Sequence, residues 1–133
     1  MRIVLDTNVL LSAIFTRGVC EALLDALIES DAIDLVLSQY ILNEFREHAA
    51  GKFAAPAQDV KRAIAFLRGH AQIVEPAPLP KTACKDPDDI PVLGTAVAAT
   101  ARVLVTGDAQ LLGLGHIHDT LILSPRAFFD GLS

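Results

Sequence analysis

The chain has 133 residues, 52% of them hydrophobic, and a formal net charge of −5. This length suits one domain with one core and is too short for two ordinary domains, so we expect a single domain over residues 1–133. The apolar runs are far shorter than the roughly 20 residues of a membrane-spanning helix, and the start lacks the pattern of a signal peptide. We therefore expect a cytoplasmic protein with no membrane association, and the negative charge argues against broad, nonspecific binding of nucleic acid.

The chain opens on a predicted strand over residues 2–5 that runs directly into Asp6, Thr7 and Asn8. Its aliphatic run is typical of a central parallel strand that is buried on both faces. In open α/β sheets, ligands bind at the carboxyl edge of such strands, which is where Asp6 would lie. One of the polar residues also suits the N-cap of a helix over 9–15. Because a cap needs only one polar group, we favour a site over a cap.

Strands and helices alternate along the rest of the chain, which predicts an α/β fold. Ser38 suits the N-cap of a helix whose apolar stripe leaves Glu44 at its margin. In chain order we expect strand 2–5, helix 9–15, helix 19–28, strand 33–37, helix 39–49, helix 57–68 ended by Gly69, strand 73–74, helix 90–101, strand 103–105, strand 121–123 and helix 125–132.

Basic residues exceed acidic ones between residues 46 and 70, where five Lys or Arg stand against two acids. A solvated helical face and a substrate or partner surface explain this excess equally well. The candidate surface residues are Arg46, Lys52, Lys61 and Arg62, with Lys85 from a later segment.

Acidic residues return in residues 86–89, which hold three carboxylates immediately before the helix expected over 90–101. Asp88 or Asp89 could serve as a helix N-cap, but three acids are more than a cap requires. The strand over 103–105 then ends in Thr106, Gly107 and Asp108, which repeats the pattern of the first strand.

Parallel strands joined by right-handed crossovers would bring Asp6, Asp89 and Asp108 to one edge of the sheet, with Asp86 as a further candidate. Carboxylates that meet without a counter-charge repel one another and raise one another's pKa. A hard divalent cation such as Mg²⁺ or Mn²⁺ relieves this repulsion and commonly holds substrate phosphates. The chemistry implied is phosphodiester hydrolysis, with the cation activating water for in-line attack.

Several stretches, taken in this order, carry a resemblance to a known family. They are VLDTNVL at 4–10, Glu44, KDPDD at 85–89 before Val92 and Leu93, VTGD at 105–108 before Leu111 and Leu112, and SPRAFF at 124–129. The chain resembles the PIN-domain ribonucleases, and more narrowly the small prokaryotic VapC-like toxins of toxin–antitoxin pairs. The likeness covers nearly the whole chain, and the ordered set is more specific than any one stretch.

The resemblance implies a three-layer α/β/α sandwich around a parallel five-stranded sheet. It implies a Mg²⁺- or Mn²⁺-dependent endoribonuclease that acts on RNA, and members often form homodimers and bind an antitoxin. The catalytic and metal-binding acids that it implies are Asp6, Glu44, Asp89 and Asp108, with Asp86 as an extra acid. Asn8 and Thr106 match polar positions expected to orient carboxylates or water through hydrogen bonds. The role of Glu44 as a ligand rests on the resemblance alone.

One position departs from the family pattern. Many relatives carry Asn or Asp after the acid that corresponds to Asp89, where this chain has Ile90 followed by Pro91. Pro is tolerated in the first turn of a helix, so we expect the helix to form. The substitution puts any water or phosphate contact from position 90, and the catalytic strength, in doubt.

Two alternatives of other classes remain open. A haloacid-dehalogenase-type aspartyl-phosphate phosphatase also begins with a buried strand ending in Asp and carries a later Gly-Asp, but it usually needs a second Asp where this chain has Asn8. A noncatalytic PIN module could bind RNA or an antitoxin through the same residues. The four histidines lack the neighbours of a catalytic triad, and we expect His116 and His118 to lie at the surface.

Overall fold

The first strand lies at the centre of the sheet. In the computed structural model, which describes residues 1–132, β1 (Arg2–Leu5) pairs in parallel with β2 (Asp34–Leu37) on one side. On its other side, β1 pairs in parallel with β4 (Val103–Val105). Its three aliphatic side chains are fully buried, as the apolar run predicts.

The strand order across the sheet is β3-β2-β1-β4-β6-β5. All five predicted strands are present and parallel, including β3 (Ala71–Ile73) and β6 (Thr120–Leu123). A sixth strand, β5 (His116–Ile117), pairs antiparallel with β6 at the edge and was not predicted. The parallel core is therefore confirmed and is extended by one short strand.

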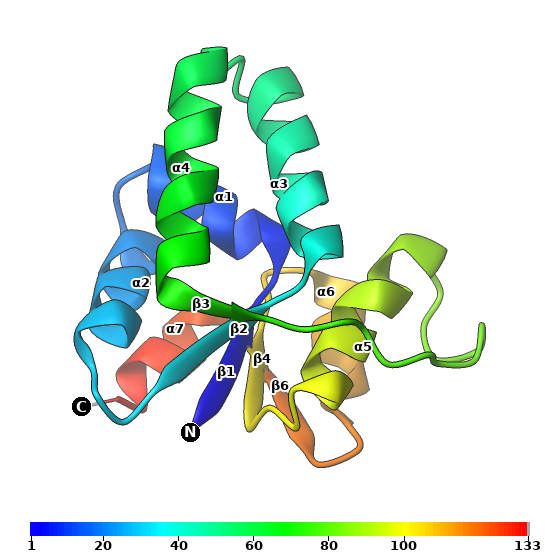
Figure 1. Cartoon of the computed structure of the whole chain (residues 1–133). Helices are drawn as coiled ribbons and strands as arrows, with labels where there is room; N and C mark the ends of the chain where they lie inside the picture. Colours follow the sequence, from blue (N-terminus) through cyan, green and yellow to red (C-terminus); the bar gives the residue numbers. More distant parts are fainter. Residues whose placement is uncertain (133) are drawn as a thin grey trace.

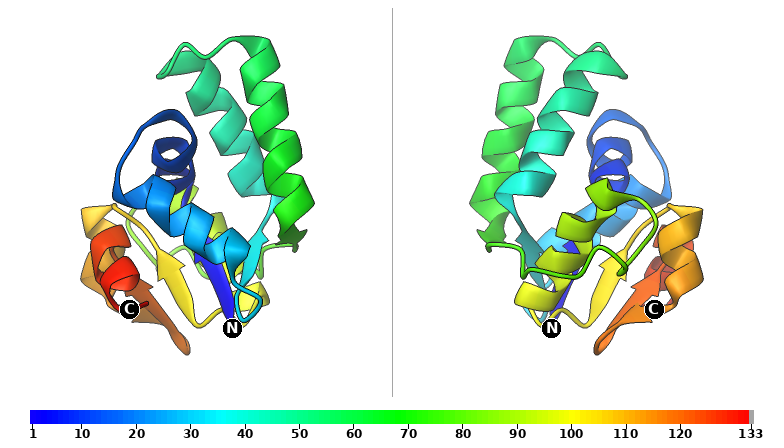
Figure 2. Two further views of the ribbon diagram at one scale, coloured as in Figure 1. Left: turned by 90° about the vertical axis from the view of Figure 1, so that its left-hand side faces the viewer. Right: turned by 90° about the vertical axis from the view of Figure 1, so that its right-hand side faces the viewer.

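Helices cover both faces of the sheet, which confirms the three-layer arrangement. Figure 2 shows α2 (Val19–Glu29) and α7 (Pro125–Asp130) on one face and α5 (Ile90–Ala98) on the other. Helix α1 (Thr7–Phe15) packs against α2, and α6 (Ala109–Leu114) packs beside β6. No helix within residues 1–132 combines the length and apolar character needed to cross a membrane.

Helices α3 (Gln39–Gly51) and α4 (Ala57–His70) form a hairpin that stands beyond the carboxyl ends of the strands (Figure 1). Helix α3 begins as predicted at Ser38, whose hydroxyl accepts a hydrogen bond from the N–H of Ile41 at 3.3 Å. The same hydroxyl accepts from Thr95 Oγ1 at 2.8 Å. The start of α3 is thereby tied to α5, and both helices are held at the same edge of the sheet.

After β3 the chain crosses toward α5 as an extended segment (Figure 1). The N–H of Ala77 in this segment donates to the carbonyl of Gly94 in α5 at 2.9 Å. A Cβ at Gly94 would lie 2.4 Å from the Ala77 carbonyl oxygen, so only glycine permits this approach. The crossing then ends in a short 3₁₀ turn, η1 (Pro87–Asp89), directly before α5.

Several predicted helix boundaries were wrong, and one helix was missed. Helix α4 runs through Gly69 to His70, because a glycine near a helix end ends the helix only where the backbone turns. Helix α5 stops at Ala98, shortly before Thr100 turns into the left-handed region at φ 47°. Helix α6 was not predicted, although the helix after Asp89 forms in spite of Pro91, as expected.

Candidate active site

Two of the predicted acids follow neighbouring strands at the same edge of the sheet. Leu5 of β1 is in register with Val105 of β4, and the N–H of Asp6 donates to the Val105 carbonyl at 2.9 Å. Asp6 is 5% exposed, so its carboxylate is held inside the protein. Asp108 lies three residues beyond Val105, at the same end of the neighbouring strand.

Both of these acids also cap helices, so the cap and site interpretations are compatible. Asp6 Oδ1 accepts from the N–H of Thr7 at 2.7 Å. Asp108 Oδ1 accepts from the N–H groups of Gln110 and Leu111 at 2.8 and 3.1 Å. Each carboxylate is therefore fixed in direction by backbone donors of the helix that follows it.

The remaining acids come from α3 and from the turn before α5. Asp86 caps this turn, accepting from the N–H of Asp88 at 2.9 Å. Asp89 occupies the N-cap position of α5, but its side chain makes no capping hydrogen bond. Asp86 therefore has a structural role as a cap. The carboxylate of Asp89 has no hydrogen-bond partner among the described residues.

These side chains meet in one cavity of about 200 Å³. The five predicted acids all line it, so the structure brings together the set that the sequence proposed. Thr106 lies behind the cavity wall and is fully buried. The lining residues are Asp6, Thr7, Asn8, Glu44, His48, Asp86, Asp88, Asp89 and Asp108.

Hydroxyl groups link the acids of the different elements. Thr106 Oγ1 donates to Asp6 Oδ2 at 2.7 Å and accepts from the N–H of Asp108 at 3.0 Å. Thr7 Oγ1 donates to Glu44 Oε1 at 2.9 Å. Thr106 therefore contacts Asp6 by a hydrogen bond, and its role in orienting a catalytic carboxylate stays a prediction. Asn8 lines the cavity without a hydrogen bond to any carboxylate of the described residues, so its orienting role stays a prediction.

The acids of the cavity repel one another, because no Lys or Arg of the described residues lines it. Burial raises the pKa of Asp6, with hydrogen bonds from Thr106 and Thr7 opposing the rise. Burial also raises the pKa of Glu44, which His48 and Thr7 partly offset. Burial, followed by repulsion from Asp108, Asp6, Asp86 and Glu44, raises the pKa of Asp89 to about 7. Ionising all of these groups together therefore costs free energy.

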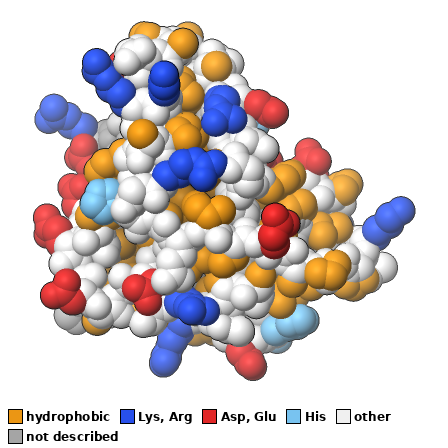
Figure 3. Space-filling model, in the orientation of Figure 1, with side chains coloured by type: hydrophobic (Ala, Val, Ile, Leu, Met, Phe, Trp, Pro, Cys, Tyr) orange, Lys and Arg blue, Asp and Glu red, His pale blue; other side chains and the backbone are white. Residues whose placement is uncertain are grey.

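No Lys or Arg within residues 1–132 lines this cavity. The one ion pair among those residues joins Arg126 and Asp130 on the remote helix α7. Lys and Arg side chains gather instead over the α3–α4 hairpin (Figure 3). The structure splits the candidate basic surface, because Arg46 and Lys61 line a groove between α3 and α4 whereas Arg62 lines a separate groove beside α1.

The donor chemistry of the cavity fits a hard divalent cation, which prefers carboxylate oxygens. In the part of the chain that is described, no three Asp, Glu, His or Cys side chains are close enough to hold one ion together. Both oxygens of Asp6 accept hydrogen bonds from Thr7 and Thr106. Mg²⁺ usually binds one or two carboxylates directly and keeps several waters. The residues therefore fit a cation held partly through water, with Asp89 the acid most free to bind it.

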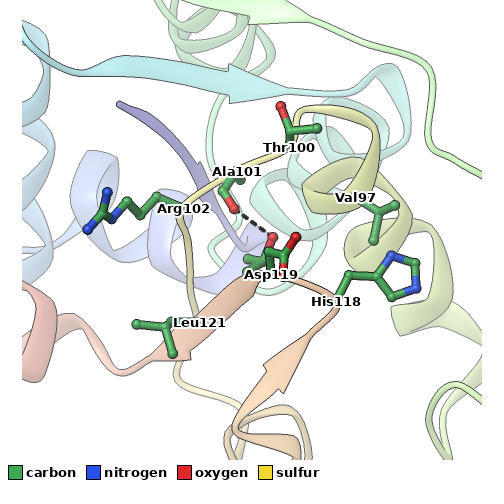
Figure 4. A pocket seen from close by; sticks show the side chains of 8 residues that line it. Val97, Thr100, Ala101, Arg102, His118, Asp119 and Leu121 are labelled. Carbon is green, nitrogen blue, oxygen red and sulfur yellow. Dashed lines mark hydrogen bonds between the residues drawn. The ribbon is translucent and has the colours of Figure 1, made fainter.

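A larger cavity, of about 610 Å³, lies elsewhere in the described part of the chain. It is at the opposite edge of the sheet, beside the first residues of β4 and β6 (Figure 4). Among its polar side chains, Thr120 is bonded to the Ala101 carbonyl at 2.6 Å, and Asp119 is the one acid that lines it. We place the candidate site by its chemistry, because this larger cavity lacks a cluster of carboxylates.

Comparison with known proteins agrees with the fold. The family model for the PIN domain matches residues 2–110. The chain belongs to the PIN-domain family. A search of curated proteins found no significant match to this PIN domain.

Solved structures show the same fold at low sequence identity. A chain of VapBC2 from Rickettsia felis bound to a DNA fragment from the promoter is 15% identical, with a TM-score of 0.68, covering 93% of this chain and 98% of that one. A chain of VapBC-1 from nontypeable Haemophilus influenzae is 17% identical, with a TM-score of 0.65 and coverages of 95% and 99%. A chain of FitAcB from Neisseria gonorrhoeae is 18% identical, with a TM-score of 0.55 and coverages of 93% and 98%. The VapC-like resemblance is thereby confirmed at the level of the fold.

Sequence reasoning missed several residues of this PIN site. Thr7 was treated only as a cap candidate, although its hydroxyl holds Glu44. His48 was set aside with the other histidines, and Tyr40 was not considered. Tyr40 and His48 lie four residues before and after Glu44, a helical spacing that places them on its face and could have identified both.

Proposed function

We propose that this PIN-domain protein is a divalent-cation-dependent endoribonuclease that hydrolyses phosphodiester bonds of RNA. The observation that carries the proposal is the cavity in which the acids at positions 6, 44, 86, 89 and 108 meet, with no Lys or Arg of the described chain among its lining residues. Such a cluster costs stability unless an external positive charge compensates it. Membership of the PIN-domain family supports the same assignment.

In this proposal, Asp6, Glu44, Asp89 and Asp108 hold Mg²⁺ or Mn²⁺ directly or through water, with Asp86 as a further acid. When bound, the cation supplies charge neutralisation and activates water for attack on phosphorus. The chain itself supplies orientation. Thr106 and Thr7 hold the carboxylates of Asp6 and Glu44 by hydrogen bonds at 2.7 and 2.9 Å. We assign Asn8, which lines the same cavity, the role of holding a water or a carboxylate through its amide.

The aspartyl-phosphate phosphatase alternative loses its support. Asn8 cannot act as the acid and base that such an enzyme needs two residues after its nucleophile. Membership of the PIN-domain family is also inconsistent with that class.

The charge distribution favours a nucleic acid as substrate, although the acidic cavity by itself repels a polyanion, and the choice of RNA rests on membership of the PIN-domain family. The basic side chains of the hairpin could attract the phosphates that flank the scissile bond. We propose Arg46 and Lys61, which line one groove, as the first contacts, with Lys52 and Arg62 on the same hairpin as further ones. Lys85 lies next to Asp86, at the acidic turn rather than on the hairpin, and would act separately.

We further propose that the protein is the toxin of a toxin–antitoxin pair, a cytoplasmic homodimer with a cognate antitoxin. The support is the fold, which matches chains from VapBC assemblies over nearly their whole length. Light scattering of the purified protein tests the dimer. Co-purification with the product of a neighbouring short gene tests the antitoxin, and free growth of cells that express the chain alone would count against a toxin.

Cleavage of labelled single-stranded RNA tests the enzymatic proposal. We expect cleavage in Mn²⁺ or Mg²⁺, none in EDTA, and a loss of at least about 100-fold in Asp6→Asn or Asp108→Asn, because each removes an acid from the cation site. Asp25→Asn is the matched control, since it makes the same chemical change at an exposed position of α2. We expect Asp25→Asn to cleave like the wild type.

The outcomes separate the remaining interpretations. Cleavage that persists in EDTA, or in both site variants, would exclude a metal-dependent nuclease at this cavity. RNA binding without cleavage in any divalent cation would favour the noncatalytic PIN module. A parallel reaction with DNA of the same sequence decides whether the enzyme selects RNA.

A further inference from the structure

Hydrogen bonds between elements tie three of the cavity's acids to one another. Asp6 and Asp108 are connected through Thr106, whose hydroxyl contacts both residues. Asp6 and Glu44 are connected through Thr7. These acids are therefore held in place whether or not a cation is present.

The turn that carries Asp86 and Asp89 is held differently. Its own hydrogen bonds are local: Asp86 accepts from the N–H groups of Asp88 and Asp89 and from the thiol of Cys84. Within residues 81–89, one hydrogen bond comes from a distant part of the described chain. It is the bond from Tyr40 Oη to the carbonyl of Asp88, at 2.8 Å.

Helix α3 positions Tyr40 for this contact. Tyr40 lies one helical turn before Glu44, and its hydroxyl is 3.4 Å from Glu44 Oε2. A tyrosine hydroxyl has one proton to donate, and the shorter contact with the Asp88 carbonyl takes it. The hydroxyl therefore bridges the helix that carries Glu44 and the turn that carries Asp89.

A neutral donor suits this position better than a cation would. Asp89 faces repulsion from Asp108, Asp6, Asp86 and Glu44, which pushes the turn outward when no cation is bound. A Lys or Arg would hold the turn but would also neutralise the charge that attracts the ion. Burial and the neighbouring carboxylates raise the pKa of Tyr40, which keeps the hydroxyl protonated.

We propose that Tyr40 is a positioning residue, whose hydroxyl anchors the turn of Asp86–Asp89 to α3 and so keeps Asp89 in the cavity before a cation arrives. The inference rests on the proposed function, because it gives Tyr40 a part in building the cation site. Phe at this position would fill the same space without donating the hydrogen bond, so the hydroxyl alone carries the role.

Mn²⁺ binding, measured from the electron paramagnetic resonance signal of the free ion, tests this role without any activity assay. We expect Tyr40→Phe to bind Mn²⁺ about 3- to 10-fold more weakly, the range that corresponds to one hydrogen bond. Cys84→Ala is the matched control, because it removes a hydrogen bond inside the same turn and leaves the Tyr40 contact intact. We expect Cys84→Ala to bind Mn²⁺ like the wild type.

Hydrogen exchange in EDTA tests the anchor itself. We expect faster exchange in residues 81–89 of Tyr40→Phe, unchanged exchange in β1, and protection restored by saturating Mn²⁺. A general loss of stability would instead accelerate exchange in β1 as well.

The results separate this inference from the proposed function. If the wild type binds Mn²⁺ and Tyr40→Phe binds it as tightly, the role of Tyr40 is wrong and the proposed function stands. Faster exchange without weaker binding would make Tyr40 a contact of the fold alone and would also overturn the proposal. If the wild type binds no Mn²⁺, the cation site fails, and exchange in EDTA still decides whether Tyr40 holds the turn.

Discussion

Hydrogen bonds restrain the carboxylates of Asp6, Asp89 and Asp108 to different degrees, although all three line the same cavity. Both oxygens of Asp6 accept hydrogen bonds, and one oxygen of Asp108 accepts two backbone N–H groups. Asp89 has no such bond among the described residues, and its pKa rises to about 7. The least restrained of these carboxylates is therefore one whose protonated form is favoured near neutral pH when no cation is present.

This difference predicts how Asp89→Asn changes stability. The pKa of Asp89 is higher in the folded chain than its ordinary value of 3.8, so the folded state binds the proton more tightly. The metal-free protein therefore loses stability as the pH rises from about 4 to about 7. We expect Asp89→Asn in EDTA to raise Tm by about 3 °C at pH 8 and to leave it unchanged at pH 4, the rise being small because Asp89 is partly exposed.

Thermal unfolding at the two pH values checks this expectation. Asp25→Asn again serves as the control, because it removes an exposed carboxylate away from the cavity. A Tm at pH 8 that is equal to or lower than that of the wild type would mean that Asp89 is not repelled by its neighbours.

At the scale of elements, the crossing segment and α5 fix where the acidic turn lies. Gly94 permits the close backbone contact between α5 and Ala77 of the crossing segment, since a Cβ there would lie 2.4 Å from the Ala77 carbonyl oxygen. We expect Gly94→Ala to destabilise the protein by about 1–3 kcal/mol, because backbone must move to make room. Gly69→Ala makes the same change in α4, where nothing lies within 4 Å, and should be neutral or slightly stabilising. Denaturant unfolding of both variants checks the contrast, and equal effects would contradict it.

The central strands could be predicted from sequence because their burial leaves an uninterrupted aliphatic run, as in residues 3–5 and 103–105. Strand β5 could not, since its two residues follow Gly115 and gain strand geometry only by pairing with β6. Helix α6 is six residues long, too short for a clear apolar period. Its one local signal was Asp108, which the sequence interpretation assigned to the site rather than to a cap.

The site was predictable to the extent that strand ends determine it. Asp6 and Asp108 follow from the parallel pairing of β1 and β4, whereas Glu44 was proposed from the family resemblance alone. The hydroxyl of Thr7 bonds to Glu44 across 37 positions of sequence, and that of Tyr40 bonds to Asp88 across 48. No local pattern encodes such contacts, because they depend on how α3 is placed over the sheet.

At the scale of the whole molecule, the fold separates the two signs of charge. The α3–α4 hairpin, residues 39–70, carries five Lys or Arg against three acids, although the chain has a net charge of −5. The hairpin stands beyond the same sheet edge at which the acids meet (Figure 1). A polyanion could therefore be attracted by the hairpin while the cavity remains reserved for a cation.

This separation predicts that Mg²⁺ stabilises the whole chain and does so in a pH-dependent way. A ligand that binds the folded state alone adds about 2.7 kcal/mol at 100 times its Kd. Asp89, with a pKa of about 7, must lose its proton to bind the ion, so the affinity for Mg²⁺ should rise about tenfold from pH 6 to pH 8 and level off above that.

Calorimetric titration with Mg²⁺ and Tm at both pH values measure this rise in affinity. Asp108→Asn should lose the stabilisation by Mg²⁺, and Asp89→Asn should lose its pH dependence. If Asp89→Asn instead keeps the full tenfold change, another group controls proton release and the ion does not bind at Asp89.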